Sequence, residues 1–148
     1  MILHILNGDC ALPGWCPCGF PGEALVWREN YLQGVLPDTE DVTAFNRIRA
    51  AELHKIAPEK PERAIFAELQ AMHQKLCSLQ DGDSLVLWLD CCPFDEALKK
   101  RLLHLIAGLP DGVAVYLVQQ DVTWDCEAFQ RYCNWQDFLF HRGKNAIE

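Results

Sequence analysis

The sequence predicts an α/β fold, in which a mostly parallel, Rossmann-like sheet of four to five strands is covered by helices on both faces in three layers. Short, nearly continuous apolar runs alternate along the chain with segments whose apolar residues have helical spacing. Such runs are typical of strands that are buried on both faces. With 148 residues and no repeat or linker-like stretch, the chain is expected to form a single α/β domain over residues 1–148.

Four strands and four helices account for most of the pattern, and a short fifth strand is expected near the end. The expected strands are residues 2–6, 24–27, 85–89 and 113–118, followed by residues 137–141. The expected helices are residues 41–56, 61–79, 93–107 and 124–133. The second helix has the strongest signal, because its apolar residues from Ile65 to Leu79 form a single stripe. Gly108 is expected to end the third helix as its C′ residue.

Composition and charge narrow the class of protein. The formal net charge is −8, and the 13 Lys and Arg residues are scattered, which disfavours nucleic-acid binding because such binding needs a basic face. The N-terminus has no basic region, and no apolar run is long enough to cross a membrane, so we expect a soluble, cytoplasmic protein with no membrane contact. The eight cysteines are expected to be reduced, since disulfide scaffolds are usually smaller, secreted chains.

Polar residues follow the expected strands, and these residues predict the place of a ligand site. In open parallel sheets, ligands bind outside the carboxyl ends of the strands, near a topological switch point. The predicted ligand-binding residues are Asn7, Gly8, Asp9, Arg28, Glu29 and Asp90. We expect a small anionic or nucleotide-like ligand held by Arg28 and loop amides, because a guanidinium binds carboxylates and phosphates bidentately.

Two carboxylates near such a ligand have further chemical uses. Asp9 and Asp90 could act as an acid and a base or hold Mg²⁺. The same residue types also turn chains and cap helices, so a purely structural role stays open. Whether the protein is an enzyme, and which cofactor it uses, also stays open.

The loop after the first strand matches no glycine-rich phosphate cradle. Gly8 and Gly14 have five residues between them, which is neither the dinucleotide-binding spacing nor that of a P-loop. Pro13 and Pro17 leave little room for a long helix there. Any phosphate bound at this loop would therefore depend on Arg28 and on backbone amides.

Cysteines supply an alternative site. A thiol-based metal or redox site would use Cys10, Cys16, Cys18, Cys91 and Cys92. Their C-x-C and C-C spacings differ from the paired C-x₂₋₄-C spacing of structural zinc sites, so inert thiols are the simpler interpretation. Cys77, Cys126 and Cys133 are expected on helix faces or in the core. A third hypothesis, a non-enzymatic interaction module, expects an exposed apolar patch around Trp15 and Phe20.

Three motifs together suggest a family. The motifs are an apolar strand ending in Asn7, Gly8 and Asp9, a strand ending in Trp27 and Arg28 with Gly34 and Pro37 downstream, and a strand with Leu87 and Trp88 that leads to a helix containing Leu102. In this order, over residues 2–121, the chain resembles the bacterial domain of unknown function family 1835, which leaves residues 122–148 as a C-terminal extension. The resemblance implies a Rossmann-type α/β domain and no established activity. Family members tend to carry His-Asp after the third strand, where this chain has Asp90 and Cys91.

Overall fold

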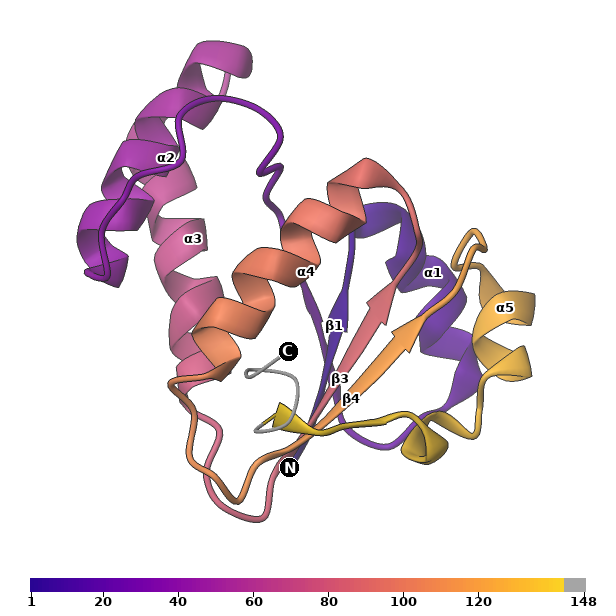
Figure 1. Cartoon of the computed structure of the whole chain (residues 1–148). Helices are drawn as coiled ribbons and strands as arrows, with labels where there is room; N and C mark the ends of the chain where they lie inside the picture. The colour runs from indigo at the N-terminus through magenta and orange to yellow at the C-terminus, as the bar shows by residue number, and fades with distance from the viewer. Residues whose placement is uncertain (143–148) are drawn as a thin grey trace. The chain divides into compact units, whose positions relative to one another are not determined.

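A computed structural model describes residues 1–142 and contains a five-stranded sheet (Figure 1). The strands are β1 (Ile2–Leu6), β2 (Glu23–Val26), β3 (Ser84–Leu89), β4 (Ala114–Gln119) and β5 (Leu139–Phe140). Their order is β2-β1-β3-β4-β5; the first four run parallel, and β5 runs antiparallel to β4. The predicted α/β class and the mostly parallel sheet are therefore confirmed.

The chain forms two compact units. Among the described residues, the first contains Met1–Arg28 and residues 79–142, and the second is Glu29–Ser78. All five strands belong to the first unit. The sequence analysis predicted a single domain because no linker-like stretch marks the boundaries between these two units.

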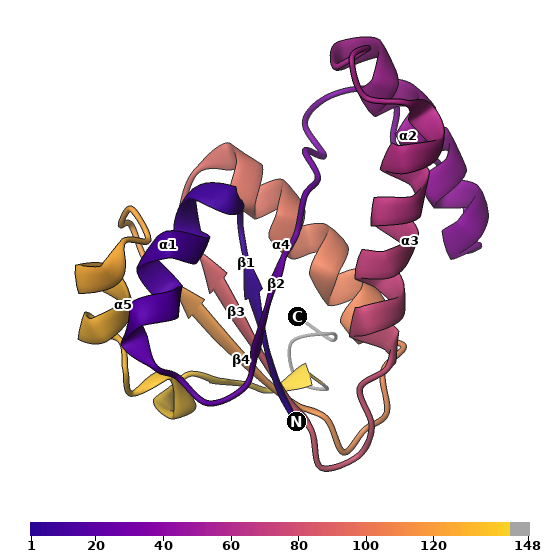
Figure 2. The same ribbon diagram turned by 180° about the vertical axis from the view of Figure 1, so that it is seen from behind.

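Helices cover both faces of the sheet in the first unit. They are η1 (Asp9–Ala11), α1 (Leu12–Trp15), η2 (Cys16–Cys18), α4 (Pro93–Ile106), α5 (Cys126–Arg131) and η3 (Trp135–Asp137). In Figures 1 and 2, α4 lies on one side of the sheet, and α1 and α5 lie together on the other. Pro13 and Pro17 keep the turns after β1 short, as predicted. The three-layer arrangement is therefore present.

The strands are apolar on both sides of the pleat because both faces are buried. Leu6, Val86, Trp88 and Val118 belong to a buried cluster that also contains Phe129 of α5. The residues of β3 on the opposite face of the sheet are fully buried as well, since every residue of Leu85–Leu89 has 0% of its surface exposed. The near-continuous apolar runs of the sequence thus mark strands between two helical layers.

The strand order creates a topological switch point between β1 and β3. From β1 the chain passes through α1 to β2 on one side, and from β3 it passes through α4 to β4 on the other. Because such crossovers are right-handed, α1 and α4 lie on opposite faces (Figure 2). The carboxyl ends of β1 and β3 are thus the place where ligands bind in sheets of this kind.

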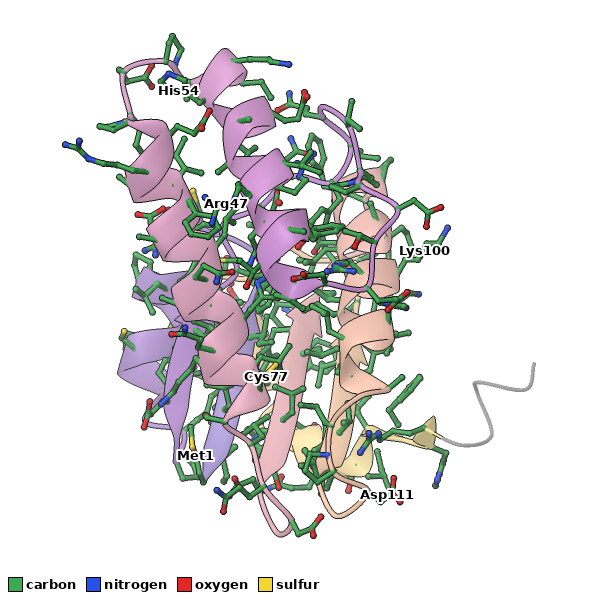
Figure 3. The ribbon with its side chains drawn as sticks, turned by 90° about the vertical axis from the view of Figure 1, so that its left-hand side faces the viewer. Met1, Arg47, His54, Cys77, Lys100 and Asp111 are labelled. Carbon is green, nitrogen blue, oxygen red and sulfur yellow. The ribbon has the colours of Figure 1, made fainter. Side chains whose placement is uncertain are left out.

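The second unit is a pair of packed helices, α2 (Val42–Ile56) and α3 (Glu62–Cys77). Asp41 caps α2, because its Oδ1 accepts a hydrogen bond from the amide of Ala44 at 3.1 Å. His54, near the end of α2 (Figure 3), donates from Nδ1 to the carbonyl of Lys60 at 2.7 Å and so holds the connection to α3. Both helices begin and end within two residues of the predicted ranges.

Gly108 occupies the predicted C′ position of α4, but without the left-handed backbone that is usual there. The helix ends at Ile106 with Ala107 as its C-cap, and Gly108 is not among the glycines with positive φ. The amides of Gly108 and Leu109 instead bond to carbonyls three residues earlier, at 3.1 and 3.0 Å. The predicted C′ position is therefore confirmed, but the left-handed conformation typical of a C′ glycine is absent, because hydrogen bonds to residues three positions earlier satisfy the last carbonyls.

Gly22 lies where β1 and β2 begin to pair, and it allows a close backbone approach. Its φ is +111°, and an added Cβ would overlap the carbonyl oxygen of Ile2. Gly82 has φ +94° and no atom within 4 Å of an added Cβ. We expect Gly22→Ala to lower the melting temperature more than Gly82→Ala, which carries only the left-handed strain of about 1–2 kcal/mol. Equal losses in thermal unfolding would contradict the close approach.

Candidate functional site

Asn7 and Asp90 lie at the switch point, each directly after its strand. The amide Nδ2 of Asn7 donates to Oδ2 of Asp95 at 2.7 Å and lies 3.5 Å from Oδ2 of Asp90. Asp95 belongs to the first turn of α4. One neutral amide at the end of β1 thus joins two carboxylates, one at the end of β3 and one on the following helix.

Asp95 is the most buried member of this group, with 4% of its surface exposed. Its Oδ2 also accepts a hydrogen bond from the backbone amide of Asp90 at 2.7 Å. Burial raises the pKa of Asp95, and the negative charge of Asp90 raises it further, although the bonds from the Asp90 and Asn7 amides act in the opposite direction. Sequence reasoning missed this residue, because an acid in the first turn of a helix is ordinary.

Cys92 completes a group of three potential metal ligands. One ligand atom each from Asp90, Cys92 and Asp95 lies within 4.8 Å of the others. Oδ1 of Asp90 accepts the backbone amide of Cys92 at 2.8 Å, so the turn between β3 and α4 fixes both residues. Burial raises the pKa of the Cys92 thiol, as does its hydrogen bond with Asp90.

Gln119 at the end of β4 borders the group. Its Nε2 donates to the carbonyl of Asp90 at 3.0 Å and to Oε1 of Glu96 at 2.7 Å. Its Oε1 accepts from Nζ of Lys99 at 3.0 Å, and Lys99 also pairs with Glu96 at 3.1 Å. The lysine on this side of α4 is therefore engaged with Glu96 and Gln119.

Asp9 and Arg28 form an ion pair at the same edge of the sheet. Nη2 of Arg28 lies 2.8 Å from Oδ1 of Asp9, and Nε donates to the same oxygen at 3.0 Å. The side chain of Arg28 is 48% exposed and that of Asp9 is 65% exposed, so water screens the ion pair and the pair contributes little to stability. Gly8 has extended backbone, with φ 173°, and an added Cβ would meet no atom within 4 Å. The fold therefore does not require glycine at this position.

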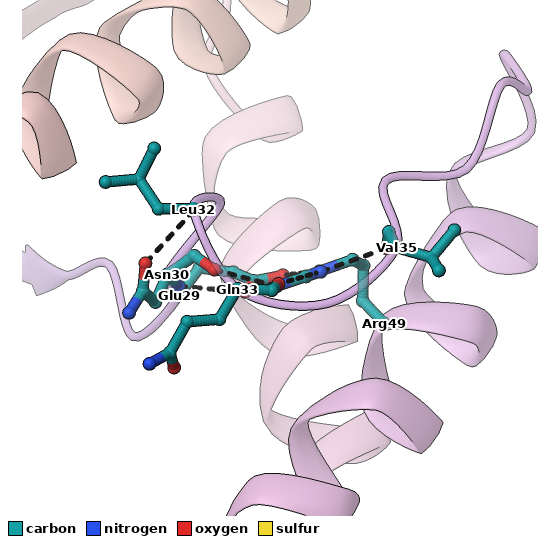
Figure 4. Close-up of polar contacts among 6 residues, drawn as sticks. All are labelled: Glu29, Asn30, Leu32, Gln33, Val35 and Arg49. Atoms are coloured by element: carbon teal, nitrogen blue, oxygen red, sulfur yellow. Dashed lines mark hydrogen bonds and ion pairs between the residues drawn. The ribbon is translucent and has the colours of Figure 1, made fainter.

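Glu29 belongs to the second unit and is fully engaged there. Its carboxylate binds Arg49 of α2 through two hydrogen bonds, at 2.7 and 2.9 Å, and both side chains are buried (Figure 4). The remaining donors of Arg49 hold the carbonyls of Asn30, Gln33 and Val35. Because this carboxylate anchors the segment after β2 to α2, we leave Glu29 out of the proposed site.

The five cysteines of the alternative site do not gather into one ligand group within residues 1–142. Cys10, Cys16 and Cys91 are exposed, and Cys92 lies with the two carboxylates. Cys18 instead lies beside a cysteine of α5, with its Sγ 4.0 Å from Sγ of Cys126. That contact joins residues 108 positions apart, and no local spacing could have signalled it.

The apolar patch expected for an interaction module is not formed around Trp15 and Phe20. Trp15 is buried, with 9% of its surface exposed, and Phe20 is half-buried. Both rings pack on His4, at centroid distances of 5.1 and 6.1 Å. The expectation of an exposed patch is therefore wrong, because these rings complete the core on the α1 and α5 face of the sheet.

No protein-family model, curated protein or solved structure matches the chain. The resemblance to family 1835 therefore stays a prediction from its three motifs. Within residues 1–142, every helix is too short or too polar to span a membrane.

Proposed function

We propose that the switch point between β1 and β3 binds a divalent metal ion, which in turn holds a small anionic or nucleotide-like ligand. The observation that carries this proposal is the group of Asp90, Cys92 and Asp95, whose ligand atoms lie within 4.8 Å of one another. The group follows the carboxyl end of β3 and contacts Asn7 at the end of the neighbouring β1, which is where open α/β sheets bind their ligands. The position of the group and the chemistry of its ligand atoms thus both favour the binding of a metal ion together with a ligand.

Charge supports a cation at this place. The hydrogen bonds described for Asp90 and Asp95 come from neutral donors, namely the side-chain amide of Asn7, the backbone amides of Asp90 and Cys92, and the thiol of Cys92. Burial, and to a smaller extent the neighbouring charge of Asp90, disfavour the ionised form of Asp95 and raise its pKa. A divalent ion would favour that ionised form without any change in the fold.

The ligand types indicate which ion would bind. Two carboxylates and one thiol suit Zn²⁺ better than Mg²⁺, which prefers oxygen ligands alone. Three protein ligands leave at least one position on a tetrahedral ion for a further ligand. Binding would displace the proton of Cys92, because the thiolate is the form that ligates metal.

Arg28 supports an anionic ligand at the same edge. It follows β2, and its exposed pairing with Asp9 is weak enough for a carboxylate or phosphate to replace. A guanidinium binds such anions bidentately. The metal would bind the ligand directly, and Arg28 would neutralise its remaining charge.

We expect calorimetric titration of the reduced protein with Zn²⁺ to show one ion per chain and Asp95→Asn to weaken that binding at least 10-fold. The substitution keeps the shape of the side chain and an oxygen that accepts hydrogen bonds, but it removes a charged ligand. Cys92→Ser should weaken binding similarly, because a hydroxyl is a poor ligand for Zn²⁺.

Asp111→Asn is the matched control, since Asp111 lies in the exposed turn before β4 (Figure 3). Its affinity for Zn²⁺ should equal that of the unaltered protein. Unchanged affinity in both Asp95→Asn and Cys92→Ser would overturn the proposal. Native mass spectra of the same samples would report any bound ion or co-purified organic anion.

A further inference from the structure

Cys18 and Cys126 form a pair of neighbouring thiols outside the group at the switch point. Cys18 ends η2 and Cys126 begins α5, and their Sγ atoms lie 4.0 Å apart. Both side chains are partly exposed, so a small reagent can reach them. A disulfide bond is about 2.05 Å long, so closing the pair needs each sulfur to move by about 1 Å, which small side-chain rotations provide.

The backbone around the pair holds the two thiols in place. An added Cβ at Gly14 would lie 2.8 Å from the backbone nitrogen of Cys126, so α1 approaches the start of α5 as closely as a glycine allows. Sγ of Cys18 donates to the carbonyl of Gly14 at 3.3 Å and lies 3.8 Å from the carbonyl oxygen of Cys126 at the start of α5. Asp125 caps α5, because its Oδ1 accepts the amide of Ala128 at 2.9 Å. Local structure thus fixes the Cys18 thiol and the backbone that carries Cys126.

We propose that Cys18 and Cys126 are a redox-active dithiol, which a low-molecular-weight disulfide such as oxidised glutathione converts to an intramolecular disulfide. The crosslink would tie the loop after α1 to α5 across 108 positions of the chain. It uses none of the residues proposed to bind metal. The inference therefore stands or falls independently of the proposed function.

The exchange takes two steps, and the atoms balance. The thiolate of Cys126 attacks one sulfur of oxidised glutathione, which forms a mixed disulfide and releases one glutathione thiolate. Cys18 then loses its proton to the solvent and attacks Sγ of Cys126 in the mixed disulfide, which releases the second glutathione. The protein loses two protons and two electrons, and oxidised glutathione gains them and becomes two thiols.

The order of the two attacks follows from the surroundings of Cys18. Burial, together with the neighbouring Cys126 thiol, raises the pKa of Cys18 to about 11. Cys18 is therefore protonated at neutral pH and reacts slowly with a free reagent. Its attack on the mixed disulfide is intramolecular, and proximity compensates for the small fraction of thiolate.

The test is incubation of the native chain with oxidised glutathione, followed by alkylation of free thiols in denaturant and mass spectrometry. Of the eight cysteines, six should still react, and peptide mapping should show one crosslink between the peptides of Cys18 and Cys126. Thermal unfolding of the oxidised protein should shift upward by several degrees, because the crosslink restricts the unfolded chain. Dithiothreitol should reverse both changes.

Two variants separate this pair from the other thiols. Cys126→Ser should form no crosslink at Cys18, whereas Cys133→Ser, which removes an exposed thiol after the same helix, should form it as before. Eight reactive thiols after treatment of the unaltered protein would overturn the proposal. A crosslink that joins any other pair would overturn it as well.

Discussion

Replacing Glu29 with alanine is expected to lower the free energy of unfolding by about 3–5 kcal/mol, because the guanidinium of Arg49 would remain buried without its carboxylate. The side chains of Arg49 and Glu29 are 0% and 1% exposed, and Nη2 lies 2.7 Å from Oε1. Arg49 also lies over the ring of Tyr31, at 5.6 Å from the ring centroid. Urea unfolding at neutral pH measures the loss.

A matched control lies in the same helical unit. Lys60 and Glu68 form an exposed ion pair at 2.6 Å, so Glu68→Ala should change the free energy of unfolding by less than about 1 kcal/mol. Replacing both Glu29 and Arg49 with methionine should recover only part of the loss, because no unpaired charge is then buried but the carbonyls of Asn30, Gln33 and Val35 lose their donor. If Glu29→Ala cost no more than Glu68→Ala, the ion pair would not anchor the segment after β2, and Glu29 would again be a candidate ligand residue.

The fold could be predicted from the sequence because its signals are local. Strands buried on both faces must be apolar at every position, as in Leu85–Leu89, and a helix with one buried face must repeat its apolar residues every three or four positions, as from Ile65 to Leu76. Prolines at residues 13 and 17 excluded a long helix after β1. Each of these signals depends only on neighbours along the chain.

The candidate site could be predicted only in part, because it depends on contacts between distant residues. Asn7 and Asp90 were expected at neighbouring strand ends, since the carboxyl ends of parallel strands meet at one edge of a sheet. The sequence shows Asp95 only as an acid in the first turn of a helix, and its contact with Asn7 crosses 88 positions. The buried partner of Glu29 could not be predicted either, because no feature of the sequence around Arg49 distinguishes it from a solvent-exposed arginine on the same helix.

Replacing His4 with alanine is expected to lower the free energy of unfolding by about 3–5 kcal/mol at neutral pH, as for other buried aromatic rings. His4 is fully buried in β1, and its Nδ1 accepts a hydrogen bond from Nε1 of Trp88 at 3.0 Å. The substitution would leave a cavity beside Trp15 and an indole N–H without its acceptor. His141→Ala is the control, because His141 is exposed and should change the stability little.

The same residue should make the stability depend on pH in a defined direction. Nε2 of His4 donates to the carbonyl of Pro21 at 2.9 Å, so the imidazole is neutral, and a proton on Nδ1 would break the bond from Trp88. Burial lowers the pKa of His4 from its ordinary value of 6.5, so below that pH the unfolded chain binds a proton that the folded chain refuses. The contribution of His4 to stability is therefore complete above pH 6.5 and declines as the pH falls toward the lowered pKa. Urea unfolding at pH about 7.5 and about 5.5 should then show a smaller difference between the unaltered protein and His4→Ala at the lower pH. A difference that did not change with pH would mean that His4 binds its proton equally well in both states, which would contradict a buried, neutral imidazole.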